Sequence, residues 1–401
     1  MMLASPIYAP PIRRHQQAVQ PDYEKLEAAV ALAGEGRARE SVQKVFEHLF
    51  PTATIPDLTL EPYRYVQGSA RATARLEGDE LVVTVPLVQL PAGGRAIAAL
   101  RYIVTELSGA GRLHQPRLHG ENVVLEFRDK LTRLHPAKVV EVLREMPLAA
   151  DNSDDWLIGQ FGALPLERGS ITPLDDDEAV RAEAVWRSHW NDVDALFKES
   201  QRKRSVWFLG QLASYTVSRI RFAVPLCGIL SARLAESAAT FDSGQENPSK
   251  REAALAKCVQ EMKAVTSEEL RRNLGHAEYA LSPLDEGSPA LLKYFFAEGE
   301  HMKTIDQLRK SGQPLDAGLA LVGIYTVLLA RFSWSDEVRS EFESGLAQAS
   351  GKPWREAAAL LFAHAQGVLV AKFGGAGAAT DEPASEPKLT SEAVDGSNGA
   401  G

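Results

Sequence analysis

The stretch YVQGSARATARLEGDELVVTVPLVQL, residues 65–90, decides the fold of the first third of the chain. Over residues 65–76, small or apolar side chains alternate with mostly polar ones, a period of two that is typical of a strand with one buried and one solvated face. The segment EGDE that follows is a turn sequence, and the apolar, β-branched run over residues 81–90 indicates a second strand. We therefore predict an antiparallel hairpin whose small-residue face lets a helix approach closely.

Helical patterns stand before and after this hairpin. Apolar residues recur with a helical period over residues 22–50, with an interruption near Gly34, and again over residues 95–107. Pro136 stands at the first-turn position of a further helix over residues 137–146, where proline is tolerated.

A second hairpin is predicted from residues 113–118 and 122–131, with its turn at residues 119–121. Pro116 cannot donate a ladder hydrogen bond and would confine its strand to a sheet edge. The resulting order is α, β-β, α, β-β, α. It predicts an α+β domain with an antiparallel sheet and helices over residues 21–165.

Three segments of this region resemble the YbjN and type III secretion chaperone-like superfamily. They are the strands ELVVTVPLVQLP (residues 80–91) and GENVVLEFRDKL (120–131) and the helix PAKVVEVLREM (136–146). The resemblance covers about a third of the chain and rests on topology and hydrophobic pattern. It implies a protein without catalytic residues that holds an extended client segment or docks a partner, and it also allows a homodimer.

The remainder is predicted to be helical and is divided by composition. An acidic linker over residues 166–178 leads to an all-α domain over residues 179–373, in which we expect seven or eight helices and no repeat period. Residues 1–20, which contain PIYAPPI, are expected to be a disordered arm. The tail over residues 374–401, rich in Gly, Ala, Ser, Glu and Pro, is also expected to be disordered.

Charge and cysteine content limit the function classes. The net charge of −9 comes mainly from residues 151–178, with 8 acidic and 1 basic residues, and 375–401, with 5 and 1. Both predicted domains are close to neutral and lack a basic face, so no nucleic-acid partner is expected. The two cysteines suggest a reducing cytoplasm. The most apolar run, residues 317–330, is shorter than a bilayer span and is interpreted as a buried helix, so no membrane span is expected.

Candidate chemical sites are few. Asp154 and Asp155 are interpreted as caps of a short helix over residues 156–161. Glu298 and His301 have the i, i+3 spacing of a metal-binding pair, but a second such pair is absent from the sequence. Cys227 lies in an apolar stretch typical of an inert thiol. Without a nucleophile, phosphate-binding or dinucleotide motif, we expect no enzyme activity and no cofactor.

Three histidines flank the second hairpin and are candidate zinc ligands. They are His114, His119 and His135, and their spacing is irregular for such a site. Turn and cap roles are the preferred interpretation.

The polar face of the first strand is the predicted partner site. Tyr65, Gln67, Arg71 and Arg75 alternate with the small residues and would share the face away from the packed helix. The other interpretation is an ordinary solvated strand surface. The sequence favours a non-catalytic adaptor or chaperone-like protein of the bacterial cytoplasm that docks another protein. The alternative is an enzyme or metal-binding helical bundle whose site assembles in the C-terminal domain.

Overall fold

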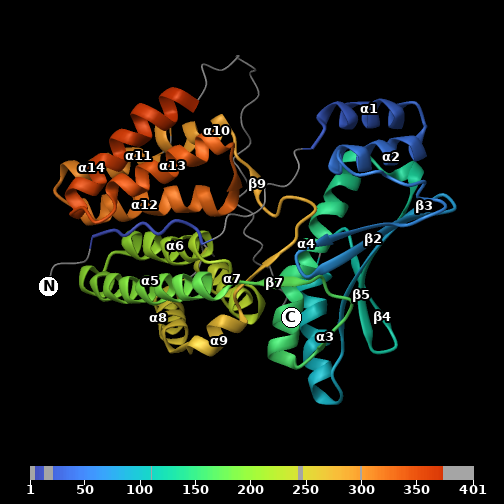
Figure 1. Ribbon diagram of the computed structural model, residues 1–401, viewed down its shortest axis with the longest axis horizontal. Coiled ribbons are helices and arrows are strands. Elements are labelled where there is room, and N and C mark those ends of the chain that lie inside the picture. Colours follow the sequence, from blue (N-terminus) through green and yellow to red (C-terminus); the bar gives the residue numbers. More distant parts are fainter. Residues whose placement is uncertain (1–4, 13–20, 110, 243–246, 299, 374–401) are drawn as a thin grey trace, which may run out of the picture.

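The computed structural model describes residues 5–12, 21–109, 111–242, 247–298 and 300–373. The chain is mixed α and β, with an antiparallel sheet in its N-terminal half and many helices in its C-terminal half, and the two parts lie side by side (Figure 1). Buried apolar side chains form two clusters. One lies in the N-terminal part and includes Leu281, and the other lies among the helices beyond residue 178.

The N-terminal part is built on one antiparallel sheet with the strand order β1-β2-β3-β5-β4, and β6 pairs with one end of β3. Pro116 lies in the edge strand β4, as predicted. The elements are α1 Tyr23–Gly34, α2 Ala38–Leu49, β1 Tyr63–Gln67, β2 Ala70–Glu77, β3 Glu80–Gln89, α3 Gly94–Leu107, β4 Gln115–His119, β5 Asn122–Lys130, the 3-10 turn η1 Leu131–Arg133, α4 Pro136–Phe161 and β6 Leu164–Pro165.

The two faces of this sheet differ. Leu81, Val83 and Val85 of β3 point to the inner face and share a buried cluster with side chains of α3 and α4. Thr84 points to the opposite, outer face, which carries exposed arginines on several strands. The sheet therefore has one helix-covered inner face and one open outer face, the arrangement common in antiparallel sheets.

The prediction of a single strand over residues 65–76 is wrong, because this segment contains two strands, β1 and β2, that form a hairpin. β1 and β2 are joined by a tight turn at Gly68 and Ser69, and Gln67 lies opposite Ala70 in the register. Gly68 has φ +66°, which glycine adopts without strain. Residues that pair across a two-residue turn lie on the same face of the sheet. Odd-numbered residues before this turn, such as Gln67, therefore share a face with even-numbered residues after it, such as Ala70. The alternation in the sequence continued through the turn and concealed it.

The predicted end of the helix at Met146 is also wrong. α4 continues from Pro136 to Phe161 with Pro147 inside it. A proline removes the hydrogen bond to the carbonyl four residues earlier, here that of Leu143. The hydroxyl of Tyr65 donates to this carbonyl at 2.7 Å and replaces the lost bond. Asp154 and Asp155 consequently lie inside the helix and are not caps.

The predicted linker is an ordered connection. Strand β7, Ile171–Pro173, pairs with β8, Gly275–Ala277, and the backbone N–H of Gly169 donates to the carbonyl of Ser69 at 2.6 Å. The acidic end of this segment begins the next helix, where Asp175 is the N-cap of a full capping box.

The C-terminal part is mainly helical, with three short strands that were not predicted. Thr266 and Ser335 act as helix N-caps, because their hydroxyls accept from the N–H groups of Glu269 and Val338. The elements are α5 Asp176–Lys203, α6 Val206–Ala223, α7 Gly228–Asp242, α8 Pro248–Ala264, α9 Ser267–Arg272, α10 Pro289–Lys293, α11 Glu300–Lys310, α12 Pro314–Arg331, α13 Asp336–Ala349, α14 Trp354–His364, the π-helical turns η2 Tyr294–Glu298 and η3 Ala365–Phe373, and the strands β8, β9 Asp285–Glu286 and β10 Phe332–Ser333.

The expected disorder of the arm is wrong for residues 5–12, which lie against α6 and the end of α13. The N–H of Ile12 donates to the carbonyl of Ala223 at 3.0 Å, and the N–H of Gly351 donates to the carbonyl of Pro6 at 2.8 Å. Residues 1–4 and 13–20 of the predicted arm, and the predicted tail over residues 374–401, lie outside the described residues.

Two stretches are long and apolar enough to cross a bilayer by length and composition. They are Pro314–Arg331, of which 72% is buried, and Trp354–Phe373, of which 28% is buried. The burial of the first stretch agrees with its interpretation as a core helix.

Candidate functional site

The four residues predicted to bind a partner do not share one surface. Arg71 and Arg75 are exposed on the outer face of the sheet. Tyr65 is 7% exposed and Gln67 is 0% exposed, because the unpredicted turn directs both to the inner side. The side-chain amide of Gln67 donates to the carbonyl of Leu281 at 2.8 Å and accepts from its N–H at 3.0 Å. Tyr65 and Gln67 therefore hold the fold together and are not available to a partner.

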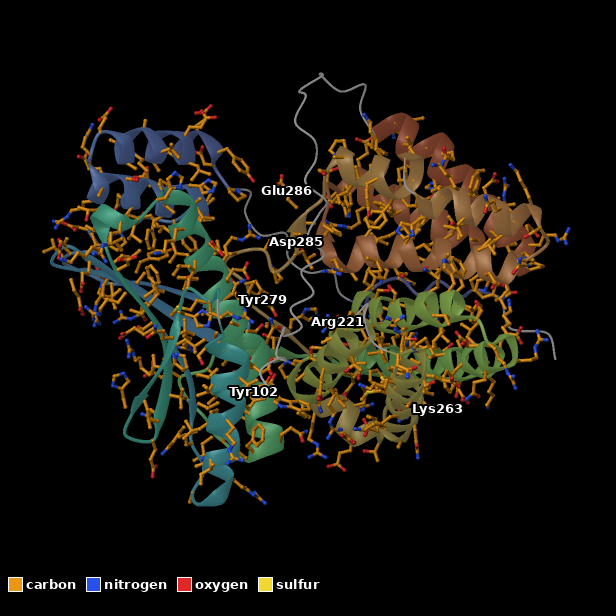
Figure 2. The ribbon with its side chains drawn as sticks, turned by 180° about the vertical axis from the view of Figure 1, so that it is seen from behind. Tyr102, Arg221, Lys263, Tyr279, Asp285 and Glu286 are labelled. Carbon is orange, nitrogen blue, oxygen red and sulfur yellow. The ribbon has the colours of Figure 1, made fainter. Side chains whose placement is uncertain are left out.

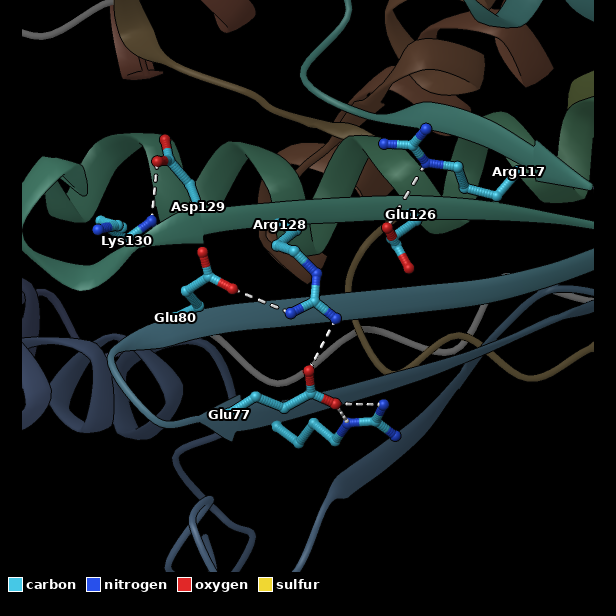
Figure 3. A network of polar contacts seen from close by, with 8 residues as sticks. Glu77, Glu80, Arg117, Glu126, Arg128, Asp129 and Lys130 are labelled. Carbon is cyan, nitrogen blue, oxygen red and sulfur yellow. Dashed lines mark hydrogen bonds and ion pairs between the residues drawn. The ribbon is translucent and has the colours of Figure 1, made fainter.

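Ion pairs join the strands of the outer face (Figure 3). Glu77 pairs with Arg75 and, at 2.7 Å, with Arg128, which also pairs with Glu80 at 3.0 Å. These contacts tie β2, β3 and β5 together and neutralise the end of the face next to the β2–β3 turn.

Arg64 and Arg71 stand apart from this network. Both are exposed, and neither forms an ion pair with any side chain in the described parts of the chain. They project from the outer face of β1 and β2, where Arg64 lies opposite Thr73 and Arg71 opposite Val66. This corner of the sheet therefore presents two guanidinium groups with free donors beside a half-buried valine.

A cluster of carboxylates lies on α4, where it meets the β1–β2 turn. The N–H of Ser69 donates to Oδ1 of Asp151 at 2.5 Å, and its hydroxyl lies 2.8 Å from Oδ1 of Asp151 and from Oδ2 of Asp154. Arg168 pairs through Nε with Asp154 at 2.9 Å and through Nη2 with Asp155 at 2.7 Å. The i, i+3, i+4 spacing puts the three aspartates on one face of the helix. The spacing was visible in the sequence, but it became meaningful only once the helix was known to continue past proline.

Burial changes the acidity of this cluster. It raises the pKa of Asp154 to about 7, although Arg168 opposes the shift, and it also raises the pKa of Asp151. Desolvation disfavours the charged carboxylate, and one arginine does not compensate for three acids. Asp154 therefore takes up or releases a proton near neutral pH.

The same cluster connects the two parts of the chain. Tyr279 donates its hydroxyl to Asp151 at 3.3 Å, and the N–H of Gly68 donates to the carbonyl of Glu278 at 2.8 Å. Figure 2 shows Tyr279 between the sheet and the helices, close to Arg221 of α6. A cavity of about 230 Å³ opens here, lined by side chains of both parts, among them Asp151, Asp155, Cys227, His276 and Tyr279. Asp151 in this cavity already accepts hydrogen bonds from Ser69 and Tyr279, and Asp155 pairs with Arg168. The polar groups of the cavity therefore join segments of the chain.

The cysteines are not activated for nucleophilic chemistry. Burial raises the pKa of Cys227 to about 11 and that of Cys258 to about 11, so both remain protonated thiols. Burial also lowers the pKa of His189, whose Nε2 lies 2.9 Å from the carbonyl of Thr216 inside the helical core. These groups behave as core residues.

The candidate metal ligands are dispersed in the described residues. His301 is exposed and stacks on Phe295 with ring centroids 6.4 Å apart, and the side chain of Glu298 lies outside the description. His135 is the N-cap of α4, while His114 is buried and His119 is exposed. Across the described parts, no three His, Cys, Asp or Glu side chains are grouped so that they could hold a metal ion.

A second buried charge lies in the helical part and was not anticipated from the sequence. Arg219 of α6 is 6% exposed and pairs through Nη1 with Asp192 at 3.0 Å. Nη1 also donates to the hydroxyl of Tyr215 at 2.7 Å, and Nη2 donates to the carbonyl of Ile7 at 2.9 Å. A buried arginine in an apolar helix was the available signal, since such a group requires partners.

Comparison with known proteins found no family model and no curated protein that matches this chain.

Proposed function

We propose that this protein is a non-catalytic adaptor or chaperone-like protein that binds a partner polypeptide on the outer face of its sheet. The observation that supports the proposal is the pair Arg64 and Arg71, exposed on that face without ion-pair partners in the described structure. Arginine presents a planar fork of donors that suits carboxylates. We therefore infer a partner segment that carries Asp or Glu side chains.

The surroundings of this pair suit an extended segment. Val66 lies beside Arg71 on the same face, and the arginines are spaced along neighbouring strands. The carboxylates of a bound segment could reach the guanidinium groups, whereas the side chain of Val66 already lies against Gly169 of the chain itself. Because exposed charges gain little from a single pair, several such contacts are needed for stable binding.

The two buried apolar clusters bear on how the whole chain is organised. We infer a unit over residues 21–165 that is similar to the YbjN and type III secretion chaperone-like superfamily, followed by a mainly helical unit, in a bacterial cytoplasmic protein. Two distinct buried clusters support this division. The raised pKa values of Cys227 and Cys258 support binding over nucleophilic catalysis.

Charge reversal tests the proposal. In Arg71→Glu, repulsion should reduce recovery of acidic partners on the immobilised protein about tenfold, equivalent to about 1.4 kcal/mol. The matched control is Arg101→Glu, which makes the same change at an exposed site on α3, the helix on the other side of the sheet. The measurement is quantitative mass spectrometry of polypeptides retained by wild type and by each variant.

A partner that binds through this face is lost with Arg71→Glu, retained with Arg101→Glu and released by salt. If both variants melt normally and retain the same polypeptides in the same amounts as wild type, the outer face is not the binding surface.

A further inference from the structure

The helical part already binds an extended peptide segment, namely residues 5–12 of its own chain. The hydrogen bonds described for this segment involve its main-chain atoms. The groove donates to the carbonyls of Pro6 and Ile7, and it accepts from the N–H groups of Tyr8 and Ile12 at 3.0 Å each. Main-chain contacts of this kind do not depend on side-chain identity, so another extended segment could make them.

Arg219 is the central donor of this groove. Asp192 and Tyr215 hold Nη1, and this leaves Nη2 directed at the carbonyl of Ile7. A buried guanidinium donor without an acceptor is costly, so the groove is built to receive a carbonyl at this point.

Several side chains of the segment also contact the groove: Pro6 is buried, and Tyr8, Ala9 and Ile12 pack against the helical core. Tyr8 stacks on Phe222 of α6 with ring centroids 6.4 Å apart and planes inclined by 30°. The side chain of Ile7, by contrast, is 44% exposed. Pro6, Pro10 and Pro11 restrict the segment to extended geometry and lower the entropy that binding costs.

The segment fills its groove incompletely. A space of about 20 Å³ remains between it and the groove side chains, which include Val322, Thr326 and Leu346. Unfilled apolar space loses contact energy, so a segment with a better-fitting side chain would bind more tightly.

We propose that the groove between α6, α12 and the end of α13 is a receptor for an extended, proline-containing partner segment with an aromatic side chain at the position of Tyr8. Residues 5–12 are its tethered competitor. This site is separate from the outer face of the sheet and does not depend on the function proposed there. Binding of a partner here requires release of the chain's own segment.

The test uses a fluorescent peptide of residues 5–12, SPIYAPPI, in place of the partner segment. A chain lacking residues 1–12 should bind it at least tenfold more tightly than the full chain, because a tethered segment competes at an effective concentration on the order of millimolar. A peptide with Tyr8→Ala should bind the shortened chain at least tenfold more weakly. Fluorescence anisotropy measures each affinity.

Full-length variants keep the test decisive if the shortened chain does not fold. Tyr8→Ala in the full chain should loosen the segment and increase peptide binding severalfold, whereas Ile7→Ala, which trims a half-exposed side chain, should leave it unchanged. Failure of Tyr8→Ala to increase binding would overturn the proposal. So would a full-length dimer in light scattering that becomes monomeric when residues 1–12 are removed, because the groove would then belong to a second copy.

Discussion

The hydroxyl of Tyr65 compensates for a hydrogen bond that Pro147 removes from helix α4. Pro147 leaves the carbonyl of Leu143 without its helical donor, and the hydroxyl of Tyr65 supplies another from a strand 78 residues away in sequence. The carbonyl lies in the interior, where an orphan acceptor is costly. At this scale Tyr65 is a structural residue, although its place in an alternating strand predicted a surface role.

Removing this hydroxyl should destabilise the protein. Tyr65→Phe leaves the Leu143 carbonyl without a donor, and we expect the free energy of unfolding to fall by about 1–3 kcal/mol. The matched control is Tyr23→Phe, since the hydroxyl of Tyr23 donates to Glu286 at an exposed site and should contribute within about 0.5 kcal/mol. Chemical denaturation of both variants measures the difference, and equal losses would show that the Tyr65 bond has no special role.

At the scale of elements, the β1–β2 turn lies directly on α4. A Cβ at Gly68 would overlap the carboxylate of Asp151, and a Cβ at Gly169 would lie 2.7 Å from the carbonyl of Gly68. The turn, the helix and the connection after β6 therefore approach one another as closely as backbone permits. Glycine is required here for its lack of a side chain as well as for its positive φ.

Two glycine substitutions separate these two requirements. Gly68 has φ +66° and Gly78 has φ +64°, but a Cβ at Gly78 meets nothing within 4 Å. We expect Gly78→Ala to cost about 1 kcal/mol from backbone strain alone, and Gly68→Ala to cost about 3 kcal/mol or more because Asp151 must also move. Thermal unfolding measures both, and similar losses would mean that the carboxylate adapts without cost.

At the scale of the whole molecule, the junction of the two parts is held by polar contacts around α4. Asp151 contacts both the β1–β2 turn and Tyr279, while Gln67 pairs with Leu281. Most of these groups are buried, so water competes little for their hydrogen bonds. The junction is consequently sensitive to the protonation of its carboxylates.

Stability should therefore depend on pH through Asp154. Its pKa is about 7 in the folded protein and about 4 in the unfolded chain, so the folded state binds the proton more tightly. The contribution of the raised Asp154 pKa to the free energy of unfolding is complete below about pH 4, and it is lost as the pH rises from 4 to 7. In Asp154→Asn this decline should be much smaller.

The control for this prediction is Asp79→Asn, at an exposed turn, which should retain the decline of the wild type. Denaturant unfolding between pH 4 and 8 measures each slope. A wild-type curve that is flat in this interval would contradict a protonated Asp154 in the folded state.

The sequence by itself determined the local features of this protein. The break near Gly34, the second hairpin, the edge position of Pro116 and the N-caps Thr266 and Ser335 were all predictable, because each depends on a few neighbouring residues. Local conformational preference and hydrophobic periodicity can both be recognised in short segments of sequence.

Only the tertiary structure decided how these elements are used. The continuation of α4 past Pro147, the docking of residues 5–12 and the site of Arg219 depend on partners far away in sequence, and the hairpin turn at Gly68 lies on Asp151 of α4. A proline signals a helix end unless a distant hydroxyl replaces its missing bond, and a turn that preserves alternation is invisible to a periodic pattern. Long-range contacts change which local conformation is most stable, although the local sequence stays the same. Their effect is therefore seen only in the folded chain.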